Sequence, residues 1–326
     1  PLKPGLHRFW FNLQGTDPLA FDLEVRDTRR ASDWIIICLD VRHGVSVLML
    51  LPTGRTLLID TGTEALCRER VLPFLDRHAL SPDTLWITHY HDDHCGGKAL
   101  VQERYPHLTV RDYRDFRTGD TLDFEGTRLT ILNAYPDGTD ENTRSLSFVM
   151  TYRGFVYTHG GDIYGDNQRR ILQTARAGHR LDRLRTHVYH ANHHFHGSVD
   201  VDYLRAIDPA LFVVSGEEHI YGRAAYVQAV QEGVLPVLRG RSRRFIEDLL
   251  QFEVGHVVIR IQDGLHWHYE TYRDPDAVIP FCAVDPVRQG ERRSPCAEPG
   301  PTGPIMRRLE PAPGLSSRTL LQAVRR

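Results

Sequence analysis

From residue 34 onward, short apolar runs alternate with turn residues, which is the pattern of buried strands. The first three runs, "WIIICLDV", "VSVLMLLP" and "TLLIDTG", lie within residues 34–62. Further strands are expected in "DTLWITH", "RLTILNAY", "SLSFVMTY", "GFVYTHGGD", "THVYHANHH" and "ALFVVSG". The run "HVVIRIQDGLHWHYETY" predicts a terminal hairpin around Asp263 and Gly264.

Between these runs, apolar residues recur at helical spacing. This spacing predicts helices in "RERVLPFLDRHAL", "GGKALVQERY", "NQRRILQTARAG", "VDYLRAI" and "AAYVQAVQEG". Residues 1–34 are polar and broken by Gly and Pro, and the chain becomes rich in Pro, Gly and Arg from about residue 285. We therefore expect one main domain at 35–284, an irregular or edge-forming extension before it, and a tail at 285–326.

Charge and cysteine usage narrow the setting of this domain. The formal net charge is −2, so no overall basic field attracts nucleic acid. The five cysteines are scattered, odd in number and never paired as C-x-x-C, which indicates a reducing compartment. Apolar runs of the ~18 residues needed by a membrane helix are absent, and the first residues lack the pattern of a signal peptide. We expect a cytoplasmic protein without a membrane partner.

The stretch "ITHYHDDHCGG" concentrates metal-ligand residue types in one place. Residues two apart in an extended chain project to the same face, so His89 and His91 can bind one cation together. Asp93 and His94 lie where the strand turns into a helix, and they can face a second cation. Isolated histidines are usually core or surface residues, but four such residues at these offsets before Gly-Gly indicate a site for Zn, Fe or Mn.

Together with "LLIDTG" and "GGD", this stretch resembles the metallo-β-lactamase fold superfamily. The nearer resemblance is to the ComEC-like hydrolase domain of the DNA-uptake competence protein and its free-standing soluble relatives. The matching segments are "DVRHGVS" at 40–46, "NTRSLSF" at 142–148, "HHFHGS" at 193–198 and "SGEEHIYGR" at 215–223. The resemblance covers about residues 35 to 270. It implies an α/β (α+β) fold, a four-layer αββα sandwich with metals at one edge of the sheets.

The resemblance also implies further ligands. Asp162, in "GGD", is expected to bridge both metals. In "HANHHFHGS" the family's "HHGS" is interrupted; the register of the preceding strand favours His193 as the ligand, whereas the register of "HGS" would favour His194 or His196.

Other residues are expected around the ligands. Asp60 should orient a ligand histidine by a hydrogen bond from beneath the site. Asn142 and Ser145 match the family's "NxxS", near the place where members with a full ligand set have a histidine. His159 could replace that histidine or belong to the core.

Departures from the family pattern bear on catalysis. Arg42 and His43 stand in place of Gly-Gln, His219 replaces an Asn, and Arg223 replaces a His. Arg223 could bind an anionic oxygen but stays charged, so His219 is the candidate acid beside the catalytic Asp93.

These features predict a hydrolase that activates water with two divalent metal ions, with Zn preferred over Mn or Fe. The expected substrate is a small molecule, an anionic ester or phosphoester, and nucleic acid is less favoured. Lactone, thioester or amide hydrolysis remains an alternative, as does non-hydrolytic chemistry by a di-iron oxidase or a lyase. A scaffold with a vestigial metal is disfavoured because nearly all ligand-type positions are filled. The oligomeric state is left open.

Overall fold

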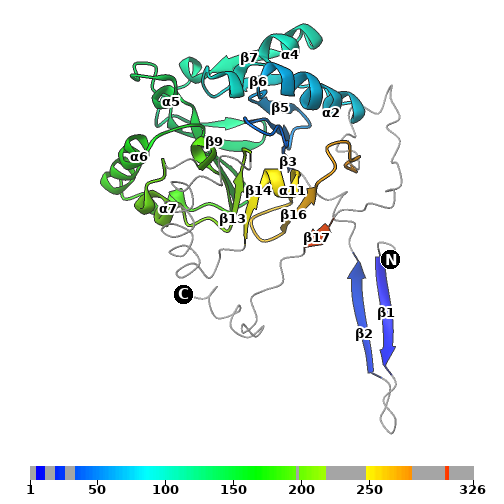
Figure 1. Ribbon diagram of the computed structural model, residues 1–326. Helices are drawn as coiled ribbons and strands as arrows, with labels where there is room; N and C mark the ends of the chain where they lie inside the picture. Colours follow the sequence, from blue (N-terminus) through cyan, green and yellow to red (C-terminus); the bar gives the residue numbers. More distant parts are fainter. Residues whose placement is uncertain are drawn as a thin grey trace.

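The computed structural model of the chain describes residues 34–195, 198–217 and 247–280, together with strands at 5–11, 19–25 and 305–307. Two large mixed sheets face each other in this part of the chain, and helices cover their outer sides (Figure 1). The strands β1 (Gly5–Phe11) and β2 (Leu19–Val25) form a separate antiparallel pair.

The first sheet has the strand order β17-β16-β15-β3-β4-β5-β6-β7. Its pairs are antiparallel except β5–β6 and β6–β7, which are parallel. The strands are β3 (Trp34–Cys38), β4 (Val47–Leu50), β5 (Thr56–Ile59), β6 (Thr84–Ile87), β7 (Thr109–Asp112), β15 (His256–Ile261), β16 (Trp267–Tyr272) and β17 (Ile305–Arg307).

The second sheet has the order β14-β13-β12-β11-β10-β9-β8. Strands β8 to β11 pair antiparallel, and β11 to β14 pair in parallel. The strands are β8 (Thr121–Phe124), β9 (Thr127–Asn133), β10 (Ser147–Tyr152), β11 (Phe155–His159), β12 (Val188–His190), β13 (Leu211–Val214) and β14 (Glu247–Leu250).

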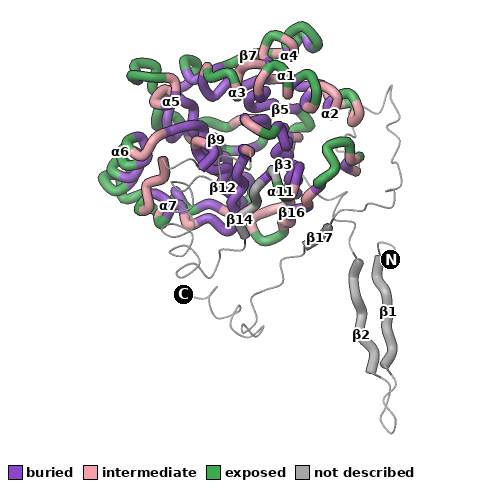
Figure 2. Tube along the Cα trace, in the orientation of Figure 1, coloured by how far each residue is buried: buried purple, intermediate pink, exposed green. Residues whose placement is uncertain are grey.

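Alternation of side chains along the strands separates an inner core from two outer ones. On β3, Trp34 points between the sheets, whereas Ile35 points toward the helices. In the inner core, Trp86 of the first sheet meets Phe148 of the second edge to face, with ring centroids 5.4 Å apart. The central strands of the described residues are accordingly buried, and the helices expose their outer faces (Figure 2).

Helices complete the outer layers. The first sheet is covered by α1 (Glu64–Leu66), η1 (Cys67–Val71), α2 (Leu72–Arg77) and α4 (Lys98–Arg104), and the second by α6 (Gly165–Ala177) and α7 (Val201–Ile207). The shorter helices are α3 (Asp92–Cys95), η2 (Tyr113–Asp115), α5 (Glu141–Arg144), η3 (Leu181–Leu184), η4 (Asn192–Phe195) and α11 (Gln251–Val254). The predicted four-layer αββα sandwich is confirmed.

Every strand and helix predicted from an apolar run within the described residues is present. The edge strands β7 and β8 escaped prediction because they expose most of their side chains. The hairpin β1–β2 falls in the segment expected to be irregular or edge-forming, and the helix expected at 224–233 lies outside the described residues. None of the helices described is long and apolar enough to cross a membrane. The three domain boundaries stay a prediction.

A buried ion pair lies on the outer face of β15 and β16. Arg260 Nε is 3.2 Å from Oε1 of Glu270, and both side chains are almost fully buried. The Tyr272 hydroxyl donates a 2.7 Å hydrogen bond to Oε2 of the same carboxylate. Burial alone would raise the pKa of Glu270, but His268, Arg260 and Tyr272 lower it to about 2. A depressed pKa means that the folded state favours the ionised carboxylate.

This pair predicts a pH dependence of stability. Because the folded pKa is depressed, the ionised Glu270 stabilises the fold above its usual pKa of 4.5, and this contribution is lost as the pH falls toward 2. Glu270→Gln should lower the free energy of unfolding at pH 7 by about 3 kcal/mol and weaken its decline at acid pH. Urea unfolding over a pH series would measure both. The exposed Glu103→Gln is the control, and parallel curves for Glu270→Gln and wild type would contradict the coupling.

Candidate metal centre

The candidate ligands of the segment 89–94 lie where β6 ends and α3 begins, close to the end of β5. After β6 the chain passes through His89 and His91 directly into α3. Gly97 follows α3 at a crowded point, where a Cβ atom would lie 2.2 Å from Cβ of Cys67. A glycine is therefore needed for the chain behind α3 to pack this closely.

The buried carboxylate of Asp60 holds His94 in place. Thr88 donates its backbone N–H to Oδ1 at 2.8 Å and its hydroxyl to Oδ2 at 2.6 Å. Nδ1 of His94 lies 2.7 Å from the same Oδ2. Because a carboxylate only accepts hydrogen bonds, Nδ1 of His94 carries a hydrogen, and Nε2 is the ring nitrogen that faces Asp162. Burial alone would lower the pKa of His94, but the carboxylates of Asp162 and Asp60 raise it well above its usual value.

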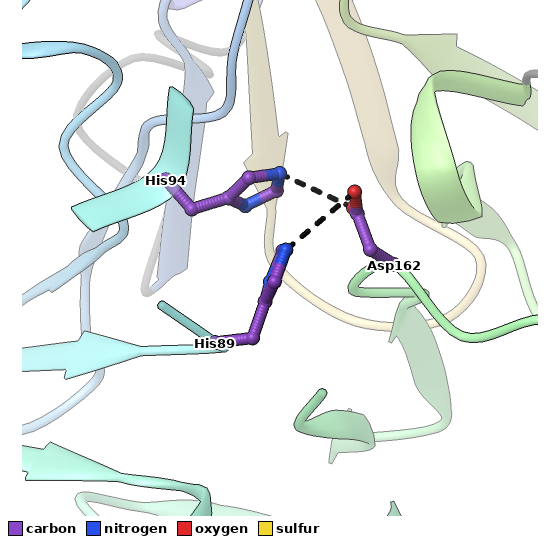
Figure 3. Close-up of side chains that lie close together, drawn as sticks. All are labelled: His89, His94 and Asp162. Carbon is purple, nitrogen blue, oxygen red and sulfur yellow. Dashed lines mark ion pairs between the residues drawn. The ribbon is translucent and has the colours of Figure 1, made fainter. Parts of the chain in front are cut away.

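Asp162 lies opposite the two buried histidines. It follows Gly161, which has a φ of +57°, and its backbone N–H donates to Oγ of Ser145 at 2.9 Å. Its Oδ1 is 3.2 Å from Nε2 of His94, and its Oδ2 is 3.7 Å from Nε2 of His89 (Figure 3). One carboxylate thus meets histidines from both ends of the "HYHDDH" segment.

A second group forms around Asp93. Its Oδ2 is 3.0 Å from Nε2 of His194, which is also 3.8 Å from Oδ2 of Asp162. Nδ1 of His194 lies 3.1 Å from the carbonyl oxygen of Ser215, so this nitrogen donates and Nε2 faces Asp93. The described residues thus contain two groups whose ligand atoms all lie within 4.8 Å of one another: His89, His94 and Asp162, and Asp93, His94 and His194.

The charges at the site suit a cation. Burial alone would raise the pKa of Asp162, but His94, His89 and His194 hold it well below its usual range. The pKa of Asp93 is likewise lowered against burial, chiefly by the hydrogen bond from His194. Burial lowers the pKa of His89, which keeps its imidazole neutral. Ionised carboxylates and neutral imidazole are the forms that bind metal.

Two close contacts test whether these residues fit a metal. Nε2 of His94 and Oδ1 of Asp162 approach each other without hydrogen-bond geometry, and both atoms are buried without a hydrogen-bond partner in the described chain. Nε2 of His194 likewise approaches Oδ2 of Asp93, at 3.0 Å. An imidazole nitrogen and a carboxylate oxygen at such distances share either a proton or a cation. Both contacts therefore fit divalent metal binding.

Other predicted site residues lie around these two groups. His91 is exposed, and its Nδ1 is 3.0 Å from Nε2 of His89. His193 lies with Nε2 3.3 Å from Nδ2 of Asn142, which places its ring outside both groups. The ring of His159 is buried and stacks between Phe148 and His190, with centroid distances of 5.2 and 5.0 Å.

His196, His219 and Arg223 lie outside the described residues. Arg42 is exposed and has a left-handed backbone, with φ of 56°.

Three further residues contact the site, and of these only Ser145 was expected near the ligands. His43 has Nε2 3.5 Å from Oδ2 of Asp93 and stacks on His194, with ring centroids 5.4 Å apart. Ser145 Oγ is 3.4 Å from Nδ1 of His89, and Ser215 accepts from His194. All three stand in segments that matched the family pattern. Their position within those motifs is the feature of the sequence that could have indicated a place at the site.

Comparisons with known proteins agree with this architecture. The family model described as "Metallo-beta-lactamase superfamily" matches residues 39–217, more than half of the chain. Hydroxyacylglutathione hydrolase of Xylella fastidiosa strain M12 is 31% identical over 96 residues, which are 26% of this chain and 34% of that protein. Recombination protein 2 of Haemophilus influenzae is 27% identical over 116 residues, 31% of this chain and 15% of that protein. The chain thus spans about a third or less of these relatives.

A solved metallo-beta-lactamase fold protein from Bacillus subtilis is 11% identical and has a TM-score of 0.40, over 66% of this chain and 95% of its own. The family match begins directly after β3 and extends past the end of β13. This segment contains every candidate ligand named above. The resemblance predicted from the sequence is confirmed: the chain belongs to the metallo-beta-lactamase superfamily.

Proposed function

We propose that this protein is a hydrolase that uses two divalent cations, held between the segment 89–94, Asp162 and η4. The observation that carries this proposal is the convergence of imidazole nitrogens and carboxylate oxygens in two groups, in each of which the ligand atoms lie within 4.8 Å of one another. His94 Nε2 faces Asp162 at 3.2 Å, and His194 Nε2 faces Asp93 at 3.0 Å. Imidazole nitrogens and carboxylate oxygens this close to one another can act together as ligands of divalent cations.

The ligands divide into two sets that share one carboxylate. We assign one cation to His89, His91 and Asp162, and the other to Asp93, His94, His194 and the same Asp162. The 3.0 Å separation of His89 Nε2 and His91 Nδ1 is close to that of two nitrogen ligands each ~2.1 Å from one ion. His194 takes the place that the strand register gave to His193.

The protein's own residues prepare the ligands for this role. Asp60 fixes the tautomer of His94, and the carbonyl of Ser215 does the same for His194. Ser145 contacts both His89 and the backbone of Asp162, so it holds two ligands from different sheets in one orientation. When bound, two such cations lower the pKa of a water toward ~7 and polarise a carbonyl or phosphoryl oxygen.

For the substrate we propose a small anionic ester or phosphoester. The exposed Arg42 is adjacent in sequence to His43, whose side chain contacts Asp93. Guanidinium groups bind carboxylates and phosphates through two parallel hydrogen bonds. The near-neutral net charge supports a small ligand over a long duplex, which requires many phosphate contacts.

A second candidate is hydrolysis of an anionic thioester. It is favoured by the partial match to a relative named hydroxyacylglutathione hydrolase, whose name specifies hydrolysis of a hydroxyacylglutathione. This candidate keeps the same metals and ligands and differs only in the bond that is cleaved.

The assignment of His194 makes a direct prediction about metal content. His194→Ala should lose about one of the two bound cations, whereas His193→Ala should keep both, because only His194 faces Asp93 and Asp162. Elemental analysis of zinc-loaded, gel-filtered protein would count the ions, with circular dichroism as a check on folding. Loss of zinc in His193→Ala alone would restore the ligand favoured by the strand register.

The support given by Asp60 predicts a graded effect on affinity. Asp60→Asn should weaken zinc binding by about 10–100-fold, because an amide cannot accept all three hydrogen bonds at that position. Asn tolerates the left-handed backbone at this residue, with φ of 55°, so the fold should persist. Competition with a chelating dye would give the affinities. Asp83→Asn, at the opposite end of β6, is the matched control, and equal weakening in both variants would exclude a specific role.

Substrate class can be decided with a panel of compounds. Zinc- or manganese-loaded protein should hydrolyse anionic esters with kcat/KM at least about 10-fold above matched neutral esters, the value of one charged hydrogen bond. The panel would include linear and cyclic phosphodiesters, an acylglutathione and plasmid DNA. The double variant His91→Ala, Asp93→Ala should lose most metal and all activity. Efficient, salt-sensitive cleavage of plasmid would instead indicate a nucleic-acid substrate.

A further inference from the structure

Four residues form a second hydrogen-bonded group beside the candidate ligands. This group, the Asn142 cluster, consists of Asn142 of α5, Tyr164, His193 of η4 and Ser198. Tyr164 comes two residues after Asp162, and the ring centroids of Tyr164 and His193 are 5.3 Å apart. The ring of His193 is in turn 6.4 Å from that of His194. The cluster therefore adjoins the metal centre on the side of Asp162 and η4.

The hydrogen bonds of the cluster have definite directions. Nδ2 of Asn142 lies 2.8 Å from the Tyr164 hydroxyl oxygen and 3.3 Å from Nε2 of His193. An amide nitrogen only donates, so its two hydrogens go to these two atoms, and both must accept. Nδ1 of His193 then carries that ring's hydrogen and donates to Oγ of Ser198 at 2.7 Å.

Two hydrogen-bonding groups of the cluster are left over. The hydroxyl of Tyr164 accepts from Asn142, so its own hydrogen is free to donate, and no acceptor for it occurs in the described part of the chain. Oδ1 of Asn142 is buried, in a residue only 3% exposed, and has no hydrogen-bond partner among the described residues. Buried polar atoms are usually satisfied, and exceptions concentrate at functional sites. Tyr164 itself is partly exposed, so an external molecule can reach it.

The backbone at the cluster is also unusual. His193, His194 and Phe195 have consecutive φ values of 46°, 49° and 59°, in the left-handed region that side chains disfavour. This conformation sends the ring of His193 to Asn142 and the ring of His194 to Asp93. Strain of this kind persists where surrounding contacts impose it, often at functional sites.

We propose that the Tyr164 hydroxyl donates a hydrogen bond to an oxygen of the substrate, with Asn142 and His193 as the residues that position it. The oxygen would be a carbonyl or phosphoryl oxygen bound beside Asp162. This inference rests on the proposed function because it needs a substrate at the metals. The Tyr164 hydroxyl would then be a hydrogen-bond donor to the substrate oxygen that the protein itself supplies.

Binding of inorganic phosphate to the zinc-loaded protein tests the proposal without turnover. Calorimetry should show that Tyr164→Phe weakens phosphate binding by about 10-fold, the effect expected from one hydrogen bond to a charged group. Asn142→Ala should weaken it in the same direction, because the hydroxyl loses its orientation. The matched control is Tyr105→Phe, whose hydroxyl contacts the backbone of Leu80 on the outer layer. Zinc content and melting temperature should match wild type in both tyrosine variants.

The outcomes separate this inference from the proposed function. Unchanged phosphate affinity in Tyr164→Phe, or no phosphate binding by zinc-loaded wild type, would overturn the role of Tyr164. Loss of zinc together with phosphate would show a structural role instead, which also overturns it. If wild type hydrolyses nothing in the panel but Tyr164→Phe selectively loses phosphate, the proposed reaction fails while the hydrogen-bond donor stands.

Discussion

The candidate site depends on the buried carboxylate of Asp60. Its two oxygens accept from Thr88 and face His94, its backbone N–H donates to the carbonyl of Trp86, and its own carbonyl accepts from Ser46. This residue thereby joins the ends of β5 and β6 to α3. The left-handed backbone at Asp60 costs roughly 1–3 kcal/mol, and the three side-chain contacts offset it. An apolar residue here would leave the buried Thr88 and His94 groups without partners.

Whether the sequence could predict a site residue depends on how far along the chain its contact partners lie. The segment 89–94 was identifiable because its ligand types are consecutive, and strand ends bring such residues to one edge of a sheet. Asp162 required a family pattern, since its partners lie about 70 residues earlier. The contact of Asn142 with His193 spans 51 residues and has no local signal at all. Long-range hydrogen bonds leave no periodic trace in the sequence.

The choice between His193 and His194 shows a second limit. Counting from the strand register assumes that side chains keep alternating after β12, but β12 ends at His190. Beyond it the left-handed backbone of η4 redirects each side chain, so that His194 contacts Asp93 and His193 contacts Asn142. Composition gives no warning of this turn, because neither histidine is a residue type that favours it as glycine does. The exposed edge strands β7 and β8 were not predicted for a simpler reason, which is that their sequences lack an alternation of apolar and polar residues.

The same turn has a consequence for the chemistry. Two consecutive histidines serve different networks, His194 with the acidic ligands and His193 with Asn142. The left-handed backbone at both residues sets the directions in which the two side chains leave the chain, and each ring is then held by its own hydrogen bonds. A site of this kind does not need a flexible loop to bring donor and metal together, because the backbone conformation already holds both. The left-handed backbone costs free energy at residues other than glycine, and the hydrogen bonds of both networks offset that cost.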